Sequence, residues 1–253
     1  MVSAPADYPG CPATVDDAIE AGRELRSPRW GLWDAVIAFV LEAVTVTGLG
    51  VLGRAFDWSL GVTVVLSTIA GWVALIGWTW FATARRGNGI VIDLGLRFTR
   101  RDVLIGLVGG AAVLAVGVLL GAITAAITGS LQSSAGEVLD ELVRAGSAPV
   151  VVGFLIMAAV VGPVVEEIFM RGLIFGALRK RGLGTGWTVV ITAAVFSLMH
   201  LEPVRLVMIF AMGVVLGIVR ARARSTGASI VTHIVNNGAE VLLVGMTLAG
   251  VTP

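Results

Sequence analysis

Long apolar stretches separated by short polar ones dominate this chain. A helix needs about 20 mostly apolar residues to cross the hydrocarbon core of a bilayer. Seven stretches approach or exceed this length: 33–53, 59–83, 103–128, 149–178, 187–201, 203–219 and 228–249. The pattern predicts an all-α fold, a polytopic membrane helix bundle of about seven transmembrane helices, with eight as the alternative.

The composition agrees with this membrane assignment. Hydrophobic residues make up 57% of the chain and charged residues only 14%, whereas soluble domains average about 25% charged residues. Residues 1–28 are polar and predict a cytoplasmic tail with a short surface helix that begins after Thr14. No internal repeat divides the rest, so we expect one membrane-embedded helical domain over 29–253.

The positive charges predict the orientation, because basic loops stay on the cytoplasmic side. With the N-terminus inside, 14 of the 18 Lys and Arg residues fall in inner segments, and only Arg54, Arg144 and Arg205 fall in outer loops. The N-terminus is therefore expected to be cytoplasmic. Arginine outnumbers lysine by 17 to one, a bias that resembles bacterial coding usage. We expect a multi-pass protein of a cell membrane, the bacterial cytoplasmic membrane.

The fourth apolar stretch contains Glu166, Glu167 and Arg171. Ionisable residues inside membrane segments are costly and by default indicate a functional site. Glu167 and Arg171 are four residues apart and share a helix face, so they are expected to form an ion pair. Glu166 projects about 100° away and has no local cation, which suits a general base that activates water. The alternative is a purely structural ion pair with a spare glutamate.

The chain has only two histidines, and both lie in apolar stretches. Phe196 precedes His200 by one turn, so its ring can restrict the imidazole. His233 and Asn237 are also four residues apart and suit stabilisation of an oxyanion. Without the other motifs, His200 is explained equally well as a polar residue at the membrane interface. His233 and Asn237 could likewise form only a hydrogen bond between helices.

Helix counting tests whether these residues can meet. At 1.5 Å per residue, Glu166 and His200 each lie about 20 Å from the cytoplasmic edge. His233 lies six residues after Gly227, or only about 9 Å deep. We therefore expect a tilt or a late entry of the last helix into the bilayer. Other polar or aromatic residues receive simpler interpretations. Glu42 faces a helix partner or lines the cavity, Glu240 supports a histidine, and Trp72 faces lipid or the interface.

Three ordered motifs on successive helices resemble the CPBP family. The motifs are Glu166-Glu167-x-x-x-Arg171, Phe196-x-x-x-His200 and His233-x-x-x-Asn237. The family includes CAAX prenyl proteases of the Ras-converting type and the bacteriocin-processing and immunity proteins called Abi. The resemblance covers roughly 146–250, and the first three stretches resemble the family only in hydropathy.

The resemblance implies intramembrane proteolysis of membrane-associated substrates, either CAAX-type or bacteriocin-like. Glu166 would activate water, His200 would orient it, and His233 with Asn237 would form the oxyanion site. The other motif residues would support this geometry: Glu167, Arg171 and Phe196. Nothing in the chain indicates a prenyl group as ligand.

The sequence leaves two questions with alternative answers: whether catalysis needs a metal ion, and whether the protein is an enzyme. Glu166, His200 and His233 could hold a catalytic zinc ion with water as fourth ligand, but a glutamate-activated water needs no ion, and we favour catalysis without metal. The expected partners are a membrane-associated peptide or protein and the lipid bilayer, with no nucleic acid. A non-catalytic scaffold or immunity protein of the same fold is the main alternative. A proton-coupled transporter is disfavoured, because no inverted repeat is visible.

Overall fold

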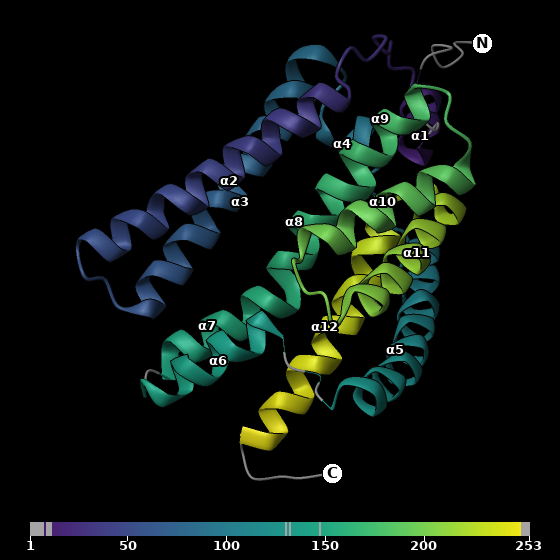
Figure 1. Ribbon diagram of the computed structural model, residues 1–253. Coiled ribbons are helices and arrows are strands. Elements are labelled where there is room, and N and C mark those ends of the chain that lie inside the picture. Colours follow the sequence, from purple (N-terminus) through teal and green to yellow (C-terminus); the bar gives the residue numbers. More distant parts are fainter. Residues whose placement is uncertain (1–7, 9–11, 130, 132, 147, 249–253) are drawn as a thin grey trace.

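The computed structural model describes residues 8, 12–129, 131, 133–146 and 148–248, and every regular element within them is helical (Figure 1). The predicted all-α fold is therefore confirmed. The helices that match the seven predicted stretches are α2 (Leu32–Ala55), α3 (Leu60–Arg86), α5 (Arg100–Thr128), the continuous helix Ala148–Lys180, α10 (Thr185–Met199), α11 (Leu206–Ala223) and α12 (Thr226–Leu248). Residue 249, the predicted end of the last stretch, lies outside the described residues.

Five helices are long and apolar enough to cross a membrane, namely α2, α3, α5, Ala148–Lys180 and α11. Their outer faces are apolar: on α5, Val108, Val118 and Ile127 are more than 70% exposed. Apolar area of this extent is not tolerated on a water-facing surface, so the protein is a multi-pass membrane protein. α10 has only 15 residues, and α12 is not among the five. Two further spans, the cytoplasmic N-terminus and the division into tail and domain stay predictions.

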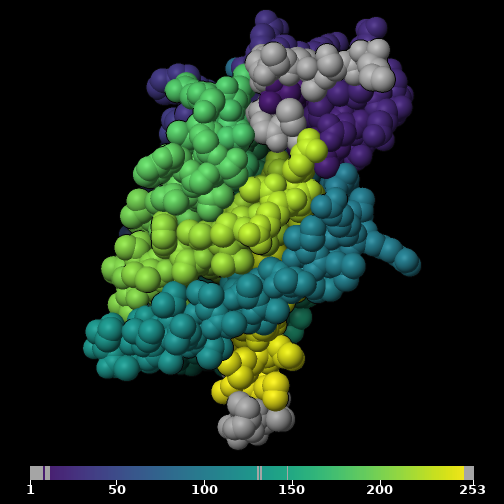
Figure 2. Space-filling view, turned by 90° about the vertical axis from the view of Figure 1, so that its right-hand side faces the viewer, coloured from purple at the N-terminus to yellow at the C-terminus, as the bar shows by residue number. Residues whose placement is uncertain are grey.

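Glycines bring α5 against α12. A Cβ atom added to Gly106 would lie 2.6 Å from Val231 Cβ, and one added to Gly109 would lie 2.5 Å from Thr232 Oγ1. The Thr232 hydroxyl also donates to the Gly106 carbonyl at 2.9 Å. Small residues allow backbones to approach closely where lipid provides no hydrophobic driving force. In Figure 2, α5 lies alongside α11 across this face, with the end of α12 emerging below them.

The α2–α3 hairpin forms a separate arm of the bundle. Its two helices pack mainly on each other, and at the near end they contact α4 (Ile90–Leu94) and the segment Ile168–Ile174. At the far end, a Cβ atom added to Gly61 would lie 3.2 Å from Val150 and 3.3 Å from Leu142. The shared core at the near end contains Leu75, Leu94 and Phe169. The hairpin can therefore form the side wall of a cavity beside the motif-bearing helices.

The N-terminal segment is packed and is not a free surface helix. Helix α1 (Ala13–Glu20) begins before Thr14, and it buries Thr14, Val15 and Ala18. Val15 and Ala18 cluster with Ile92 of α4, and the Thr14 hydroxyl donates to the Ile92 carbonyl at 2.7 Å. The predicted short helix is therefore present; it begins at Ala13, and its apolar stripe packs on α4 while Asp17 and Glu20 stay exposed. A further amphipathic helix, α6 (Ser134–Arg144), precedes α7 (Ala148–Ile156) and packs against it.

Candidate active site

The helix that carries the first motif is interrupted by two π-helical segments. These segments, Met157–Val161 and Ile168–Ile174, flank α8 (Gly162–Glu167) on either side. The Gly162 N–H bonds to the Met157 carbonyl, five residues back. Pro163 has no N–H group, so the Ala158 carbonyl loses both of its possible helical donors. Single π turns inside α-helices are frequent at functional sites, and here one leaves a carbonyl free beside the motif.

Asn237 donates a hydrogen bond to the Ala158 carbonyl, which the π turn leaves without a backbone donor. Its side-chain Nδ2 donates to the Ala158 carbonyl at 3.0 Å, and its Oδ1 accepts from Asn236 Nδ2 at 3.1 Å. A side-chain amide has two N–H bonds, so one of them remains for the cavity that Asn237 lines. The Asn237–Ala158 hydrogen bond joins α12, which carries the third motif, to the helix that carries the first motif.

Glu167 and Arg171 form the predicted ion pair in the fully buried interior. The Arg171 Nη1–Glu167 Oε1 distance is 2.8 Å, and both side chains are 0% exposed. The second Arg171 nitrogen donates to the Gly213 carbonyl at 3.0 Å. The guanidinium lies over the Phe196 ring, 4.6 Å from its centroid. Breaking such a pair leaves an uncompensated buried charge, which costs about 3–5 kcal/mol.

Glu167 also orients His233. The His233 Nδ1 atom lies 3.1 Å from Glu167 Oε1, and an ionised carboxylate only accepts hydrogen bonds. The Nδ1 atom therefore carries a proton, and the Nε2 atom points to the other side. The sequence indicated Glu240 as a candidate carboxylate partner of a histidine. That interpretation was wrong: Glu240 accepts from Asn236 at 3.3 Å, and Glu167 is the partner of His233.

Glu166 lines a cavity of about 310 Å³ on the Nε2 side of the His233 imidazole. Its side chain is 34% exposed, and its Oε2 atom lies 3.9 Å from His233 Nε2. The cavity is lined by the four predicted catalytic residues: Glu166, His200, His233 and Asn237. The two adjacent glutamates thus have different surroundings, as their 100° separation on a helix predicts.

Phe196 lies between the two histidines. Its ring makes edge contacts with His200 and His233, at centroid distances of 4.6 and 5.7 Å. The His200 Nδ1 atom lies 2.7 Å from the Phe196 carbonyl oxygen, which accepts a hydrogen bond and leaves Nε2 for the cavity. The expected packing of Phe196 on the His200 imidazole is therefore observed.

The depth problem of His233 is solved by the start of α12. Ser225 and Thr226 are fully buried, and Thr226 bonds through its N–H to Gly95 O at 2.8 Å and through its hydroxyl to Leu94 O at 2.5 Å. The last helix thus begins inside the protein, beneath the segment that follows α4. The six residues from Gly227 to His233 are therefore counted from a buried turn, and His233 lies beside Glu166 and Glu167.

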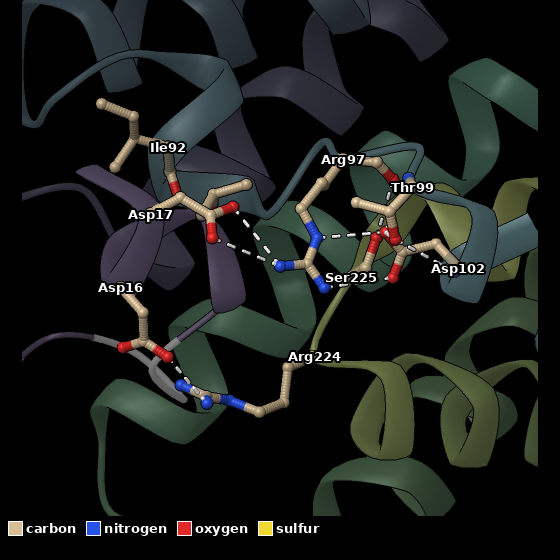
Figure 3. A network of polar contacts seen from close by, with 9 residues as sticks. Asp16, Asp17, Ile92, Arg97, Thr99, Asp102, Arg224 and Ser225 are labelled. Carbon is tan, nitrogen blue, oxygen red and sulfur yellow. Dashed lines mark hydrogen bonds and ion pairs between the residues drawn. The ribbon is translucent and has the colours of Figure 1, made fainter. Parts of the chain in front are cut away.

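Charged side chains hold this buried turn from the cytoplasmic side predicted for it (Figure 3). Arg224 pairs with Asp16 at 2.9 Å. Arg97 pairs with Asp17 at 3.3 Å and with Asp102 at 3.0 Å. The Ser225 hydroxyl donates to the Arg97 carbonyl at 2.8 Å. The N-terminal segment therefore fixes the turn from which α12 starts.

Several cavity residues could not be identified from the sequence. Trp72, expected at lipid or at the interface, lines the cavity and lies 3.4 Å from a Cβ atom added to Gly162. Asn236 lines it as well, and so do Glu202 and Arg205, which pair at 3.3 Å.

Catalysis without a metal ion stays a prediction. Within the described residues, no three His, Cys, Asp or Glu side chains are grouped as ligands for a metal ion. Glu166, His200 and His233 line one cavity. The Nδ1 atoms of both histidines have protein partners, which leaves both Nε2 atoms for water or for a metal ion.

Comparison with known proteins agrees with the motif interpretation. Residues 148–239 match the family described as type II CAAX prenyl endopeptidase Rce1-like. A Bacillus subtilis (strain 168) protein named "Putative membrane peptidase YdiL" is 29% identical over 89 residues, which cover 35% of this chain and 36% of that protein. The chain thus aligns with about a third of this curated relative, and no solved structure matches. The matched segment holds all seven motif residues, and its similarity to this family supports the resemblance to the CPBP family that the motifs indicated.

Proposed function

We propose that the protein is an intramembrane endopeptidase that cleaves membrane-associated peptides or proteins with a water molecule activated by Glu166. The observation that carries the proposal is the pairing of Glu166 with His233 across the cavity, 3.9 Å apart. Behind it, the buried Glu167–Arg171 pair fixes the imidazole. The partly exposed Glu166 carboxylate can act on a substrate, because the buried Glu167 makes the structural contacts with Arg171 and His233.

The proposed reaction uses these groups in order. Glu166 takes a proton from water, and the hydroxide oxygen bonds to the scissile carbonyl carbon. His200 Nε2 orients this water. The developing oxyanion accepts hydrogen bonds from His233 Nε2–H and from the spare Asn237 N–H. The C–N bond then breaks, and Glu166 returns the proton to the leaving amine, so that a carboxylic acid and an amine are released.

Charge balance supports the donor role of His233. Glu166, Glu167, Arg171 and protonated His233 carry two negative and two positive charges, so the four-residue cluster is neutral. A neutral cluster is the least costly arrangement in an apolar interior. Protonated His233 can donate from Nε2, whereas a neutral imidazole with its proton on Nδ1 could not.

The proposed substrates are CAAX-type or bacteriocin-like chains in the bacterial cytoplasmic membrane, and catalysis needs no metal ion. The protein, reconstituted in lipid vesicles, is expected to retain its turnover in strong chelator. Complete loss of turnover that is restored by zinc would contradict the metal-independent mechanism.

Two substitutions test the proteolytic function against a co-expressed membrane substrate. Glu166→Gln removes the base, and His233→Ala removes an oxyanion donor, so each is expected to slow cleavage by at least about 10²-fold. Glu137→Gln, on the exposed face of α6, is the matched control and should cleave as the parent does. If both active-site variants cleave like the parent, the protease function fails and the scaffold or immunity function is favoured.

A further inference from the structure

A second cavity, of about 420 Å³, lies beside Glu166. One wall is the α2–α3 hairpin, and the other comes from α8, α10 and the π segment after Glu167. Most of its lining is apolar, including Phe39, Val46, Trp72, Leu75, Phe169 and Met199. It shares Trp72, Glu166, Phe196 and His200 with the catalytic cavity. A chain bound at Glu166 can therefore place a side chain in this second space.

Glu42 of α2 is the acidic residue of this wall. The stem of its side chain packs near Gly71 of α3, where an added Cβ atom would lie 3.4 Å from Glu42 Cγ. Its carboxyl group lines the cavity. Glu42 makes no hydrogen bond or ion pair with any residue that the structure describes, and the charge that acts on it is that of Glu166, which has the same sign. An unpaired acid within a membrane helix indicates a function.

Glu166 has His233 as its cationic partner, so Glu42 is the carboxylate of this cavity that is left to be compensated by a cation. The aromatic faces of Phe39 and Trp72 add attraction for a positive group, and the apolar walls suit the aliphatic stem of a lysine or arginine side chain. We propose that this cavity is a subsite for a basic side chain of the substrate next to the scissile bond, with Glu42 as its counter-ion. The inference rests on the proposed proteolytic function and adds substrate selectivity to it.

Paired peptides in lipid vesicles test this subsite. The members of each pair differ at one position near the scissile bond, where one has lysine and the other norleucine. The full-length parent is expected to prefer lysine by at least about tenfold in kcat/KM at one position. Glu42→Gln should reduce this ratio to about one, Glu42→Asp should retain most of it, and Glu42→Lys should favour glutamate at the same position.

Two controls separate the possible failures. Glu137→Gln should keep both the ratio and the rate of the parent, and the thermal unfolding of each Glu42 variant checks its fold. Equal cleavage of both peptides by the parent, or an unchanged ratio in well-folded Glu42→Gln, would overturn the subsite while the protease function stands. A parent that cleaves no peptide of the set would overturn the protease function itself.

Discussion

Two charged networks hold α12, and they differ in their exposure to solvent. In the inner network, Glu167, Arg171 and His233 are at most 2% exposed. In the outer network, the Asp17 and Asp16 side chains are 54% and 48% exposed. Exposed ion pairs contribute about 0–1 kcal/mol, whereas breaking a buried pair costs several times more. Ion pairs therefore have different effects in the two networks. The buried pairs fix the position of His233 in the candidate site, whereas the exposed pairs stabilise the start of α12 only weakly.

The largest expected effect is the loss of the inner network. Arg171→Ala removes the guanidinium from the buried Glu167 and leaves it His233 as its remaining ion-pair partner, so we expect the free energy of unfolding to fall by about 3–5 kcal/mol and cleavage to be lost. Chemical denaturation in detergent measures the stability. Glu137→Gln serves as the surface control, and an Arg171→Ala protein as stable as the parent would show that the pair is dispensable.

The oxyanion site should show a large kinetic effect and a smaller structural one. Asn237→Ala removes one proposed donor, and a single oxyanion donor contributes about 10²–10³ in kcat. It also leaves the Ala158 carbonyl without its side-chain donor, which costs about 1–3 kcal/mol. Steady-state kinetics and unfolding of the same preparation separate these contributions. An unchanged kcat would remove Asn237 from the chemistry and leave it only the helix-joining contact.

The outer network should respond weakly, and its effect should depend on salt. Asp16→Asn together with Asp17→Asn removes the Asp16–Arg224 and Asp17–Arg97 ion pairs, so we expect a loss of at most about 2 kcal/mol at low ionic strength. Because exposed charges are screened, the loss should shrink in 1 M salt, where the Debye length is about 3 Å. Equal losses at low and high salt would contradict this assignment.

The smallest effect is a pH dependence at Asp93. Burial raises the pKa of Asp93, while hydrogen bonds from Tyr8, Asn88 and Trp30 lower it in part. Because the pKa is raised in the folded state, folding favours the protonated form. This stability is present below the ordinary aspartate pKa and is lost as pH rises through the folded value. As pH rises from the ordinary aspartate pKa through the folded value, the free energy of unfolding should therefore fall less for Asp93→Asn than for the parent. Parallel curves of unfolding free energy against pH would contradict this prediction.

The helices and the motif residues could be predicted from the sequence because each depends on local pattern. Apolar length identified the helices, and helical spacing placed Glu167 beside Arg171 and separated Glu166 from both. The grouping of both histidines with Glu166 in one cavity was also expected from the motifs. The chemical roles of these residues stay predictions.

The contacts that set the geometry could not be predicted, because they join residues far apart in the chain. The His233–Glu167 contact spans 66 positions, and the burial of Thr226 depends on a segment more than 100 residues earlier. Pro163 was visible in the sequence, but its effect depended on Asn237 of another helix. The cavity position of Trp72 likewise requires the packing of α3 beside Gly162.

The central claim is that the adjacent glutamates divide structure and chemistry between them. The most direct test measures thermal unfolding and substrate cleavage together for the parent, Glu166→Gln and Glu167→Gln in the same lipid vesicles. We predict that Glu166→Gln unfolds like the parent and cleaves about 10²–10⁴ times more slowly, while Glu167→Gln is destabilised. A Glu166→Gln protein that cleaves at the parental rate would contradict the account.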